Sequence, residues 1–366
     1  MEKKKILYFI LVPWKWIKQR PHFIAEDLSR DYDLTVAEKY PFNKKLRDHK
    51  GEKITIKTYF QLPKDRIKLI HNINAFLQRC WLRKELNSSD VIWLTSPLQY
   101  TYLEHIDKSK VLVFDCMDDL IEFQPTTRRK AIFKRQEEKL YKDADTVIAS
   151  SKFLASKLCD RYGNREILVV NNAIRNDINT EYKELPESIN KLINTDKFII
   201  TYIGTISNWF DFDLMRLVLE DNPKAVLYLF GPLDAELPKH DRMKHCGVVS
   251  HDFVFSVMEK SNLLIMPFVL NNLILSVNPV KLYEYIYSGK PCLAPRYGES
   301  ESFGEYVYLY ESPKECSSII SQLIAGQGAK QTLAECRKYA LSNTWSDRMK
   351  VIKAELEKKL TEKNRD

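Results

Sequence analysis

The sequence predicts an α/β protein with two domains, each a doubly wound parallel sheet covered by helices on both faces. At 366 residues the chain is too long for one ordinary hydrophobic core. Short continuous apolar runs alternate with amphipathic stretches, a pattern typical of parallel strands buried on both faces. The runs that we expect to be strands are 6–12, 91–95, 111–114, 146–149 and 167–170 in the first half, and 198–203, 225–230, 262–266 and 292–295 in the second.

A polar segment, 171–197, separates these two sets of strands. It is rich in asparagine, contains Pro186 and has little apolar periodicity, which indicates a linker. We therefore expect an N-terminal domain over 1–190 and a C-terminal domain over 191–342. The remaining 343–366 are predicted to form a C-terminal helix and tail that can pack back on either domain.

The net charge of the chain indicates the kind of partner it binds, and its cysteines indicate the cellular compartment. The formal net charge of +8 favours an anionic partner, for which nucleotide, nucleic acid and acidic lipid are all candidates. The seven cysteines are scattered and never in CxxC spacing, which indicates reduced thiols in a cytosol. The N-terminal apolar run is too short for a signal peptide, and no run reaches the ~18 residues of a spanning helix. We expect a cytoplasmic protein.

The stretch NPVKLYEYIYSGKP, residues 278–291, predicts a short helix that carries two charged residues. Asn278 suits the N-cap and Pro279 the first helical position, while Gly289 suits a left-handed stop. The free N–H groups and positive dipole of the helix start, with Lys281 in the first turn, suit a diphosphate. Glu284 lies on the same face and can accept hydrogen bonds from sugar hydroxyls. The alternative is a solvated ion pair on a surface helix.

The acidic cluster DCMDD, residues 115–119, follows an expected strand directly. Ligands of open parallel sheets bind beyond the carboxyl ends of the strands, so Asp115, Asp118 and Asp119 are candidate site residues. Three interpretations remain open: polar residues that line a cleft, ligands of a hard cation, and acids that cap helices or lie on the surface. We favour the first and expect no metal site.

Basic residues follow the first expected strand in PWKWIKQRPHF, residues 13–23. Arg20 suits bidentate anion contacts, and with His22 it is our candidate for the acceptor side of the site. The alternative is that the tryptophans pack in the core and the basic residues are solvated. In the second half, His240, His245, Cys246 and His251 match no common zinc spacing, which favours structural or nucleotide-contact roles.

Residues 64–86 form a basic amphipathic stretch. Apolar residues recur at helical spacing and six lysines and arginines dominate the charge. Such a helix can lie on an anionic membrane surface, which would suit a lipid-linked acceptor. The alternative is an ordinary helix that packs its apolar side on the core and solvates its basic side.

Several segments, in the same order along nearly the whole chain, resemble the retaining GT-B glycosyltransferases of the family 4-like kind, which include bacterial teichuronic acid and exopolysaccharide enzymes. The resemblance implies two Rossmann-like domains that face each other across a cleft. The segments are WKWIKQRPHFIAEDLSR, VLVFDCMDDLIEF, EEKLYKDADTVIASSKFL, VVNNAI, TYIGTISNWFD, GVVSHDFVFSVMEKSNLLIMPF and NPVKLYEYIYSGKPCLAP.

In the donor half, the resemblance implies roles for particular residues. Glu284 matches the second glutamate of the family's E-x7-E motif, which holds the ribose or sugar of the donor. The first glutamate of that motif is replaced here by Ser276. Lys281 resembles a phosphate-side lysine. The other implied donor contacts are the turn residues Gly204 and Thr205, the base-loop residue His251, and the helix-start residues Pro279 and Val280.

In the N-terminal half, the resemblance puts Asp115 where many relatives carry a histidine that touches the donor sugar. Asp118 or Asp119 could then orient or activate the acceptor hydroxyl. Asp115, Asp118 and Glu284 are therefore our candidate catalytic residues, and Arg20, His22 and Asp119 the acceptor-side residues.

The function that the resemblance implies is transfer of a sugar, with retention, from a UDP-, GDP- or dTDP-sugar to a hydroxyl of a bacterial surface polysaccharide intermediate. The acceptor is expected to be lipid-linked, and the protein to lie at the inner face of the plasma membrane. No cofactor is expected to be required, and no nucleic-acid motif supports nucleic acid as a partner. The alternative is a catalytically silent GT-B protein that binds nucleotide sugar or glycan as a scaffold.

Overall fold

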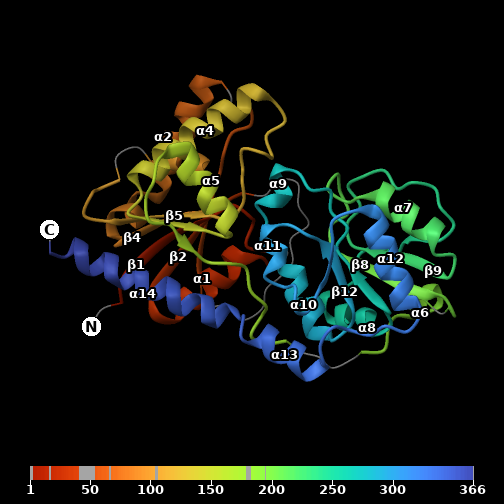
Figure 1. The fold of residues 1–366 in the computed structure, drawn as a ribbon. Coiled ribbons are helices and arrows are strands. Elements are labelled where there is room, and N and C mark those ends of the chain that lie inside the picture. Colours follow the sequence, from red (N-terminus) through yellow and green to blue (C-terminus); the bar gives the residue numbers. More distant parts are fainter. Residues whose placement is uncertain are drawn as a thin grey trace. The chain divides into compact units, whose positions relative to one another are not determined.

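The computed structural model of the chain describes residues 3–15, 18–40, 54–65, 67–103, 106–178, 183–193 and 195–365. The chain divides into two compact units (Figure 1). Unit 1 consists of Met1–Asn172 together with Trp345–Asp366. Unit 2 consists of Ala173–Thr344.

Unit 1 is built on a seven-stranded parallel sheet with the strand order β3-β2-β1-β4-β5-β6-β7. The order reverses between β1 and β4, which is the topological switch point of a doubly wound sheet. The strands are β1 (Lys5–Ile10), β2 (Asp33–Lys39), β3 (Thr55–Tyr59), β4 (Val91–Leu94), β5 (Val111–Cys116), β6 (Thr146–Ala149) and β7 (Leu168–Val169).

Helices cover both faces of this sheet, as the continuous apolar strands require. Leu7 and Phe9 of β1 pack in a cluster with Leu82, Leu140 and Leu154 from three helices on one face. On the other face α1 packs against the C-terminal helix α14, which Figure 1 draws in blue. The helices are α1 (Arg20–Asp31), α2 (Lys68–Ser88), α3 (Pro97–Thr101), α4 (Thr127–Asp143), α5 (Lys152–Tyr162) and α14 (Trp345–Lys363).

The C-terminal helix α14 is bound to unit 1 by aromatic and charged contacts with α1. The rings of Phe23 and Trp345 stack with centroids 5.5 Å apart. The Nζ of Lys353 lies 2.5 Å from an oxygen of Asp27. The chain therefore returns to unit 1 after unit 2 is complete.

Unit 2 repeats the doubly wound plan with a six-stranded parallel sheet in the order β10-β9-β8-β11-β12-β13. Its switch point lies between β8 and β11. The strands are β8 (Phe198–Ile203), β9 (Ala225–Phe230), β10 (Met243–His245), β11 (Leu263–Ile265), β12 (Cys292–Pro295) and β13 (Tyr308–Tyr310). The helices are α6 (Glu187–Ile193), α7 (Phe212–Asp221), η1 (His251–Phe253), α8 (Val254–Glu259), α9 (Asn272–Leu275), α10 (Val280–Ser288), α11 (Gly298–Glu301), α12 (Pro313–Ile324) and α13 (Leu333–Leu341).

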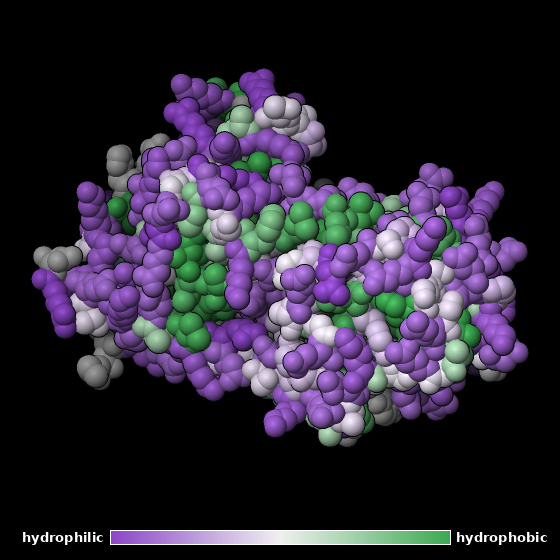
Figure 2. All heavy atoms as spheres, in the orientation of Figure 1, coloured by the Kyte–Doolittle hydropathy of each residue, from purple (hydrophilic) through white to green (hydrophobic). Residues whose placement is uncertain are grey.

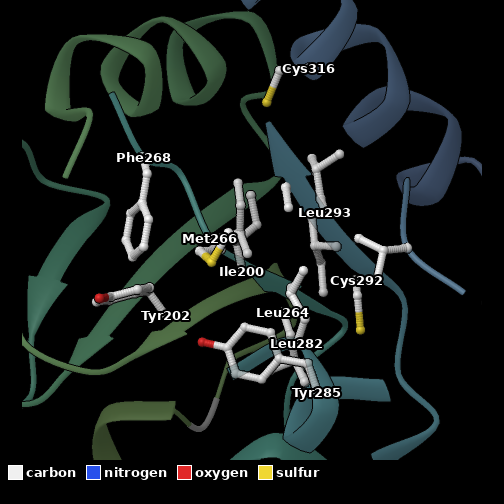
Figure 3. Close-up of a cluster of buried hydrophobic side chains, with 14 of the residues drawn as sticks. Ile200, Tyr202, Leu264, Met266, Phe268, Leu282, Tyr285, Cys292, Leu293 and Cys316 are labelled. Carbon is white, nitrogen blue, oxygen red and sulfur yellow. The ribbon is translucent and has the colours of Figure 1, made fainter. Parts of the chain in front are cut away.

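The main core of unit 2 lies where α10 meets the sheet. Figure 3 shows Leu282 and Tyr285 of α10 beside Ile200, Tyr202 and Leu264 of the strands, all of them buried. Because α10 is anchored by these apolar contacts, its charged first turn is held at a fixed place relative to the strand ends.

The boundary between the units lies earlier than the expected position near residue 190. The N–H of Ile174 donates to the carbonyl of Asn343 at 3.0 Å, which joins the first and last segments of unit 2. Leu185 and Ile193 pack with Val226 of β9 in a second cluster. The polar composition of 171–197 hid these few apolar anchors, so most of the expected linker belongs to unit 2.

Within the described part of the chain, no helix combines the length and the apolar character needed to cross a bilayer.

Candidate functional site

Helix α10 begins one residue later than the sequence predicts and stops where it predicts. The N-cap is Pro279, with φ −80° and ψ 92°, and it offers no side-chain cap. The amide of Asn278 instead donates to Glu299 at 3.1 Å. Gly289 ends the helix in the left-handed conformation, with φ 72°. The N–H groups of the first turn therefore have no cap from the N-cap side chain.

Lys281 lies directly over the glycine that ends β8. A Cβ on Gly204 would overlap the Cε of Lys281 and lie 2.7 Å from its Nζ. Gly204 has φ 154°, a backbone conformation that other residues rarely adopt. Only glycine therefore lets the lysine side chain approach the backbone at this strand end.

Two further contacts fix this arrangement. The N–H of Ile203, the last residue of β8, donates to the hydroxyl of Tyr285 at 3.0 Å, which ties α10 to the strand end. On the neighbouring strand end, a Cβ on Gly231 would overlap the carbonyl oxygen of Gly204. Two glycines and the first turn of α10 therefore meet beyond the carboxyl ends of β8 and β9, next to the switch point between β8 and β11. Open parallel sheets bind ligands at this edge.

The ammonium of Lys281 is half-buried and has no ion pair or hydrogen bond with any described residue. Burial lowers its pKa, and the charge of Glu284 opposes that shift. Its Nζ lies 6.0 Å from the centroid of the Tyr202 ring. A lysine with open donors, beside an uncapped helix start, is suited to bind an anionic group such as a diphosphate.

A pocket of about 80 Å³ opens beside Glu284, one turn further along α10. Two ion pairs flank it, Arg175 with Asp177 at 2.9 Å and Lys183 with Asp252 at 3.3 Å. The pocket is lined by Ile174, Arg175, Asp177, Ile178, Lys183, His251, Asp252, Phe255 and Glu284.

Glu284 is half-buried, and burial raises its pKa. The nearby charges of His251, Lys281 and Arg175 oppose that shift. No described residue forms an ion pair or hydrogen bond with this carboxylate, so both oxygens can accept hydrogen bonds from ligand hydroxyls. The expectation that Lys281 and Glu284 share one site is consistent with this geometry.

Three further residues on the donor side carry no charge: Thr205, Val280 and Ser276. The carbonyl of Thr205 accepts hydrogen bonds from the Tyr202 hydroxyl at 2.9 Å and the Trp209 indole at 3.3 Å. Val280 is exposed at the start of α10. Ser276 is buried, and its hydroxyl donates to the carbonyl of Asn272 in α9 at 2.9 Å. The residue that replaces the first glutamate of the E-x7-E motif therefore makes a local contact with α9.

In unit 1, Arg20 and Asp115 form a buried ion pair. The Nη2 and Nε of Arg20 donate to Oδ1 of Asp115 at 3.0 and 3.2 Å. The Nη1 of Arg20 donates to the carbonyl of Val170 at 2.6 Å, which joins α1 to the end of β7. Both side chains are almost fully buried. Their observed contacts are therefore structural, although both lie at the carboxyl edge of the sheet.

His22 also lies inside unit 1. Its side chain is fully buried, its ring is 5.2 Å from that of Trp14, and its Nδ1 accepts from the N–H of Gln19 at 3.2 Å. His22 therefore completes the capping box at the start of α1. The sequence did not predict this capping role, because His22 lies among basic residues that suggested anion binding.

Asp119 is held by two cations of α5. Arg161 donates to it at 2.7 Å and the Nζ of Lys157 lies 2.6 Å away. Burial would raise the pKa of Asp119, but the hydrogen bonds and charges of Arg161 and Lys157 outweigh it and keep the pKa below the ordinary value. The carboxylate of Asp119, which we predicted to contact the acceptor, forms ion pairs with Arg161 and Lys157 in this structure.

Asp118 differs from its two neighbours because it forms no ion pair with any described residue. Burial raises its pKa to about 6, with Asp115 and Asp119 adding to the shift and Arg20 opposing it. Of the three acids in DCMDD, Asp118 is thus the one whose carboxyl is available to a ligand and titrates near neutrality.

We expect Asp118→Asn to stabilise the protein at pH 7.5 and to have little effect near pH 4. Because its pKa is raised on folding, the folded state holds more protons than the unfolded state between about pH 4 and 6, and the stability contribution of Asp118 falls as pH rises through that range. Removing the charge should add about 1–3 kcal/mol at pH 7.5. Urea unfolding at both pH values measures this, with exposed Asp160→Asn as the control. An equal effect at both pH values would contradict the raised pKa.

Histidines and cysteines of unit 2 are used in ordinary contacts. His245 bonds the carbonyl of Gly231 at 2.8 Å, and His240 accepts from the N–H of Arg242 at 3.1 Å. Among the described residues, no group of three His, Cys, Asp or Glu side chains is arranged to hold a metal ion.

Several contributors to the unit 2 site were not among the predicted residues, Gly231 and Arg175 among them. Gly231 supports Gly204, and Arg175 lines the pocket beside Glu284. A single glycine after an expected strand was the available signal for Gly231. Arg175 directly follows VVNNAI, one of the segments that carry the resemblance, and this position was the available signal for it.

Comparison with known proteins gives a fold and one distant relative. No protein-family model matches the chain. A provisionally assigned teichuronic acid biosynthesis glycosyltransferase of Bacillus subtilis, TuaH, is 22% identical over 280 residues, which cover 70% of this chain and 68% of the relative.

Solved structures match almost the whole chain. Sucrose-phosphate synthase of Thermosynechococcus elongatus has a TM-score of 0.69 at 12% identity and covers 98% of this chain and 99% of its own. Trehalose 6-phosphate synthase of Burkholderia multivorans has a TM-score of 0.70 at 10% identity, with coverages of 98% and 99%. Anabaena HepE in complex with UDP and glucose has a TM-score of 0.68 at 15% identity. The match covers 97% of this chain and 99% of HepE. The chain has the GT-B fold, and the resemblance expected from the sequence is confirmed.

Proposed function

We propose that this protein is a glycosyltransferase that moves a sugar from a nucleotide diphosphate sugar to an acceptor hydroxyl. The observation that carries the proposal is the ammonium of Lys281 over Gly204, with Glu284 one turn away on the same helix. The lysine and the helix start suit the diphosphate, and Glu284 with its pocket suits the hydroxyls of ribose or sugar.

In the proposed reaction the bond between the anomeric carbon and the diphosphate oxygen breaks, and a bond from that carbon to the acceptor oxygen forms. The acceptor hydroxyl loses its proton to the leaving diphosphate. Negative charge develops on the leaving diphosphate. A preorganised ammonium and the uncapped N–H groups at the start of α10 stabilise that charge without reorganisation. We propose UDP-sugars as the first donors to test because HepE binds UDP-glucose.

The relative from B. subtilis supports a bacterial surface polysaccharide intermediate as the acceptor class. We propose, from the sequence resemblance, that this intermediate is lipid-linked and that transfer retains the anomeric configuration. A catalytically silent nucleotide-sugar-binding protein is the second candidate. Ser276 favours it, since a hydroxyl bonded within α9 stands where the family carries a glutamate.

The two candidates separate on product formation from UDP-, GDP- and dTDP-sugars, measured as nucleotide release and sugar incorporation into a glycan acceptor. For the enzyme we expect Glu284→Gln to lower kcat/KM by about 10- to 100-fold, because hydrogen bonds to a charged group contribute ~1.5–3 kcal/mol. Glu220→Gln, an exposed glutamate of α7, is the matched control and should leave turnover unchanged. Donor binding without turnover by any donor would favour the silent protein.

A further inference from the structure

Helix α2 buries two polar residues together with Ala75 and Leu82, and it leaves most of its large apolar side chains exposed. Asn74 and Gln78 are buried, and the amide of Asn74 accepts from the N–H of Leu62 at 2.8 Å and donates to Asp65 at 2.7 Å. An ordinary surface helix turns such a run of large apolar side chains toward the core. Six large apolar side chains on or next to α2, here called the outer face, are exposed: Ile67, Leu69, Ile73, Phe76, Leu77 and Trp81.

The outer face is too extended to be scattered surface apolarity. Leu69, Phe76 and Trp81 keep 68%, 61% and 62% of their surface exposed. Positions three and four apart lie on one side of a helix, so these side chains form one continuous stripe. In the view of Figure 2, the region where Figure 1 draws α2 and α4 is mostly hydrophilic, with a few hydrophobic side chains in green. Contiguous exposed apolar patches mark interaction surfaces.

Positive charge surrounds the outer face. Lys68, Arg83 and Lys84 are exposed along α2, with Arg79 half-buried between them. The sole acid in the α2 sequence, Glu85, has a side chain only 12% exposed and pairs with Lys57 at 2.6 Å. The face therefore presents cations and apolar groups together.

A groove of about 630 Å³ continues from the outer face, with which it shares Phe76. Its apolar lining includes Leu103, and Arg79, Arg83 and Lys110 contribute cations. Asp107 also lines it. An apolar floor with three cations suits a surface made of acyl chains and anionic headgroups.

We propose that the outer face of α2 docks this protein on the surface of an anionic lipid bilayer. Aromatic and aliphatic residues on one side of a helix, flanked by lysine and arginine, are the pattern of helices that lie in the membrane interface. A second copy of the chain is a poorer occupant, because a two-fold interface through this face would bring the same cations together. The inference does not depend on the proposed sugar transfer.

The test is sedimentation of the full-length protein with vesicles of phosphatidylcholine alone or with 30% phosphatidylglycerol. We expect binding to the anionic vesicles that weakens as salt rises. Phe76→Ser/Trp81→Ser should abolish it. Arg79→Gln/Arg83→Gln/Lys84→Gln should weaken it on the order of a hundredfold. Vesicle binding is read without donor or acceptor, so its failure is distinguishable from failure of the proposed function.

The matched control variants remove exposed apolar or cationic side chains that lie outside the outer face. Leu341→Ser/Val351→Ser removes two exposed apolar side chains, and Lys224→Gln/Lys314→Gln/Lys338→Gln removes three exposed cations. Both should bind as the wild type does, and all variants should keep the thermal unfolding midpoint. Equal loss in the controls, no vesicle binding, or a dimer that Phe76→Ser/Trp81→Ser dissociates would each overturn the proposal.

Discussion

Replacing Lys281 by alanine is expected to lower kcat/KM by about 10²- to 10³-fold while leaving the fold intact. The ammonium stands over Gly204 at the carboxyl end of β8, so its loss removes a preorganised charge from the proposed diphosphate position. The pKa of Lys281 is lowered by burial, so removing its charge also relieves a desolvation cost and should not destabilise unit 2. Steady-state kinetics with the best nucleotide sugar, together with thermal unfolding, measure both effects.

Lys290→Ala is the matched control for Lys281→Ala. Lys290 follows the C-terminal end of the same helix, where its Nζ donates to the carbonyl of Glu259 at 2.6 Å. Its loss should change kcat/KM less than twofold if position in the first turn of α10 matters. Equal losses in the two variants would instead indicate a general effect of positive charge and would contradict the assigned role of Lys281.

Asp115→Ala is expected to cost about 3–5 kcal/mol of unfolding free energy, because it leaves the Arg20 guanidinium buried without its counter-charge. Arg20→Met should be similarly costly, since it leaves Asp115 buried and unpaired. The double variant, Arg20→Met with Asp115→Leu, should recover part of the loss, because no uncompensated charge then remains. Urea unfolding of the three variants measures these differences.

The exposed pair Glu187–Lys191 of α6 provides the control for the buried pair. Its side chains are 81% and 74% exposed, so Lys191→Ala should cost less than about 1 kcal/mol. A loss as small as this in Asp115→Ala, together with a large fall in turnover, would contradict the structural role. That result would instead indicate that Asp115 and Arg20 act in substrate binding or catalysis.

The sequence predicted the two doubly wound sheets because most central strands are continuous apolar runs. β8, β9 and β12 match their expected ranges, and β1, β4 and β5 differ at their ends. The missed strands lie toward sheet edges, as β2, β3, β10 and β13 do. The mixed polar composition of β2, β3 and β10 reflects partial exposure and leaves little apolar signal, whereas β13, YLY, is apolar but only 3 residues long. β3, for example, reads TIKTY with only Tyr59 buried.

The site was predictable where its parts are close in the sequence. Lys281 and Glu284 lie three residues apart on α10, so helical spacing alone puts them on one face. The different environments of Asp115, Asp118 and Asp119 were not predictable. They depend on Arg20, Lys157 and Arg161, which come from α1 and α5, far from DCMDD in the chain. The contact of Gly231 with Gly204 likewise exists only once β8 and β9 are paired.

The most direct test of the proposed donor site is the ratio of UDP to UMP affinity, measured by calorimetry in the wild type and in Lys281→Ala. UMP lacks the second phosphate, so the ratio isolates the phosphate contact from the contacts of base and ribose. We predict that the wild type binds UDP at least tenfold more tightly than UMP and that Lys281→Ala largely loses this preference. An undiminished preference in Lys281→Ala, or no nucleotide binding by the wild type, would contradict a diphosphate site at Lys281.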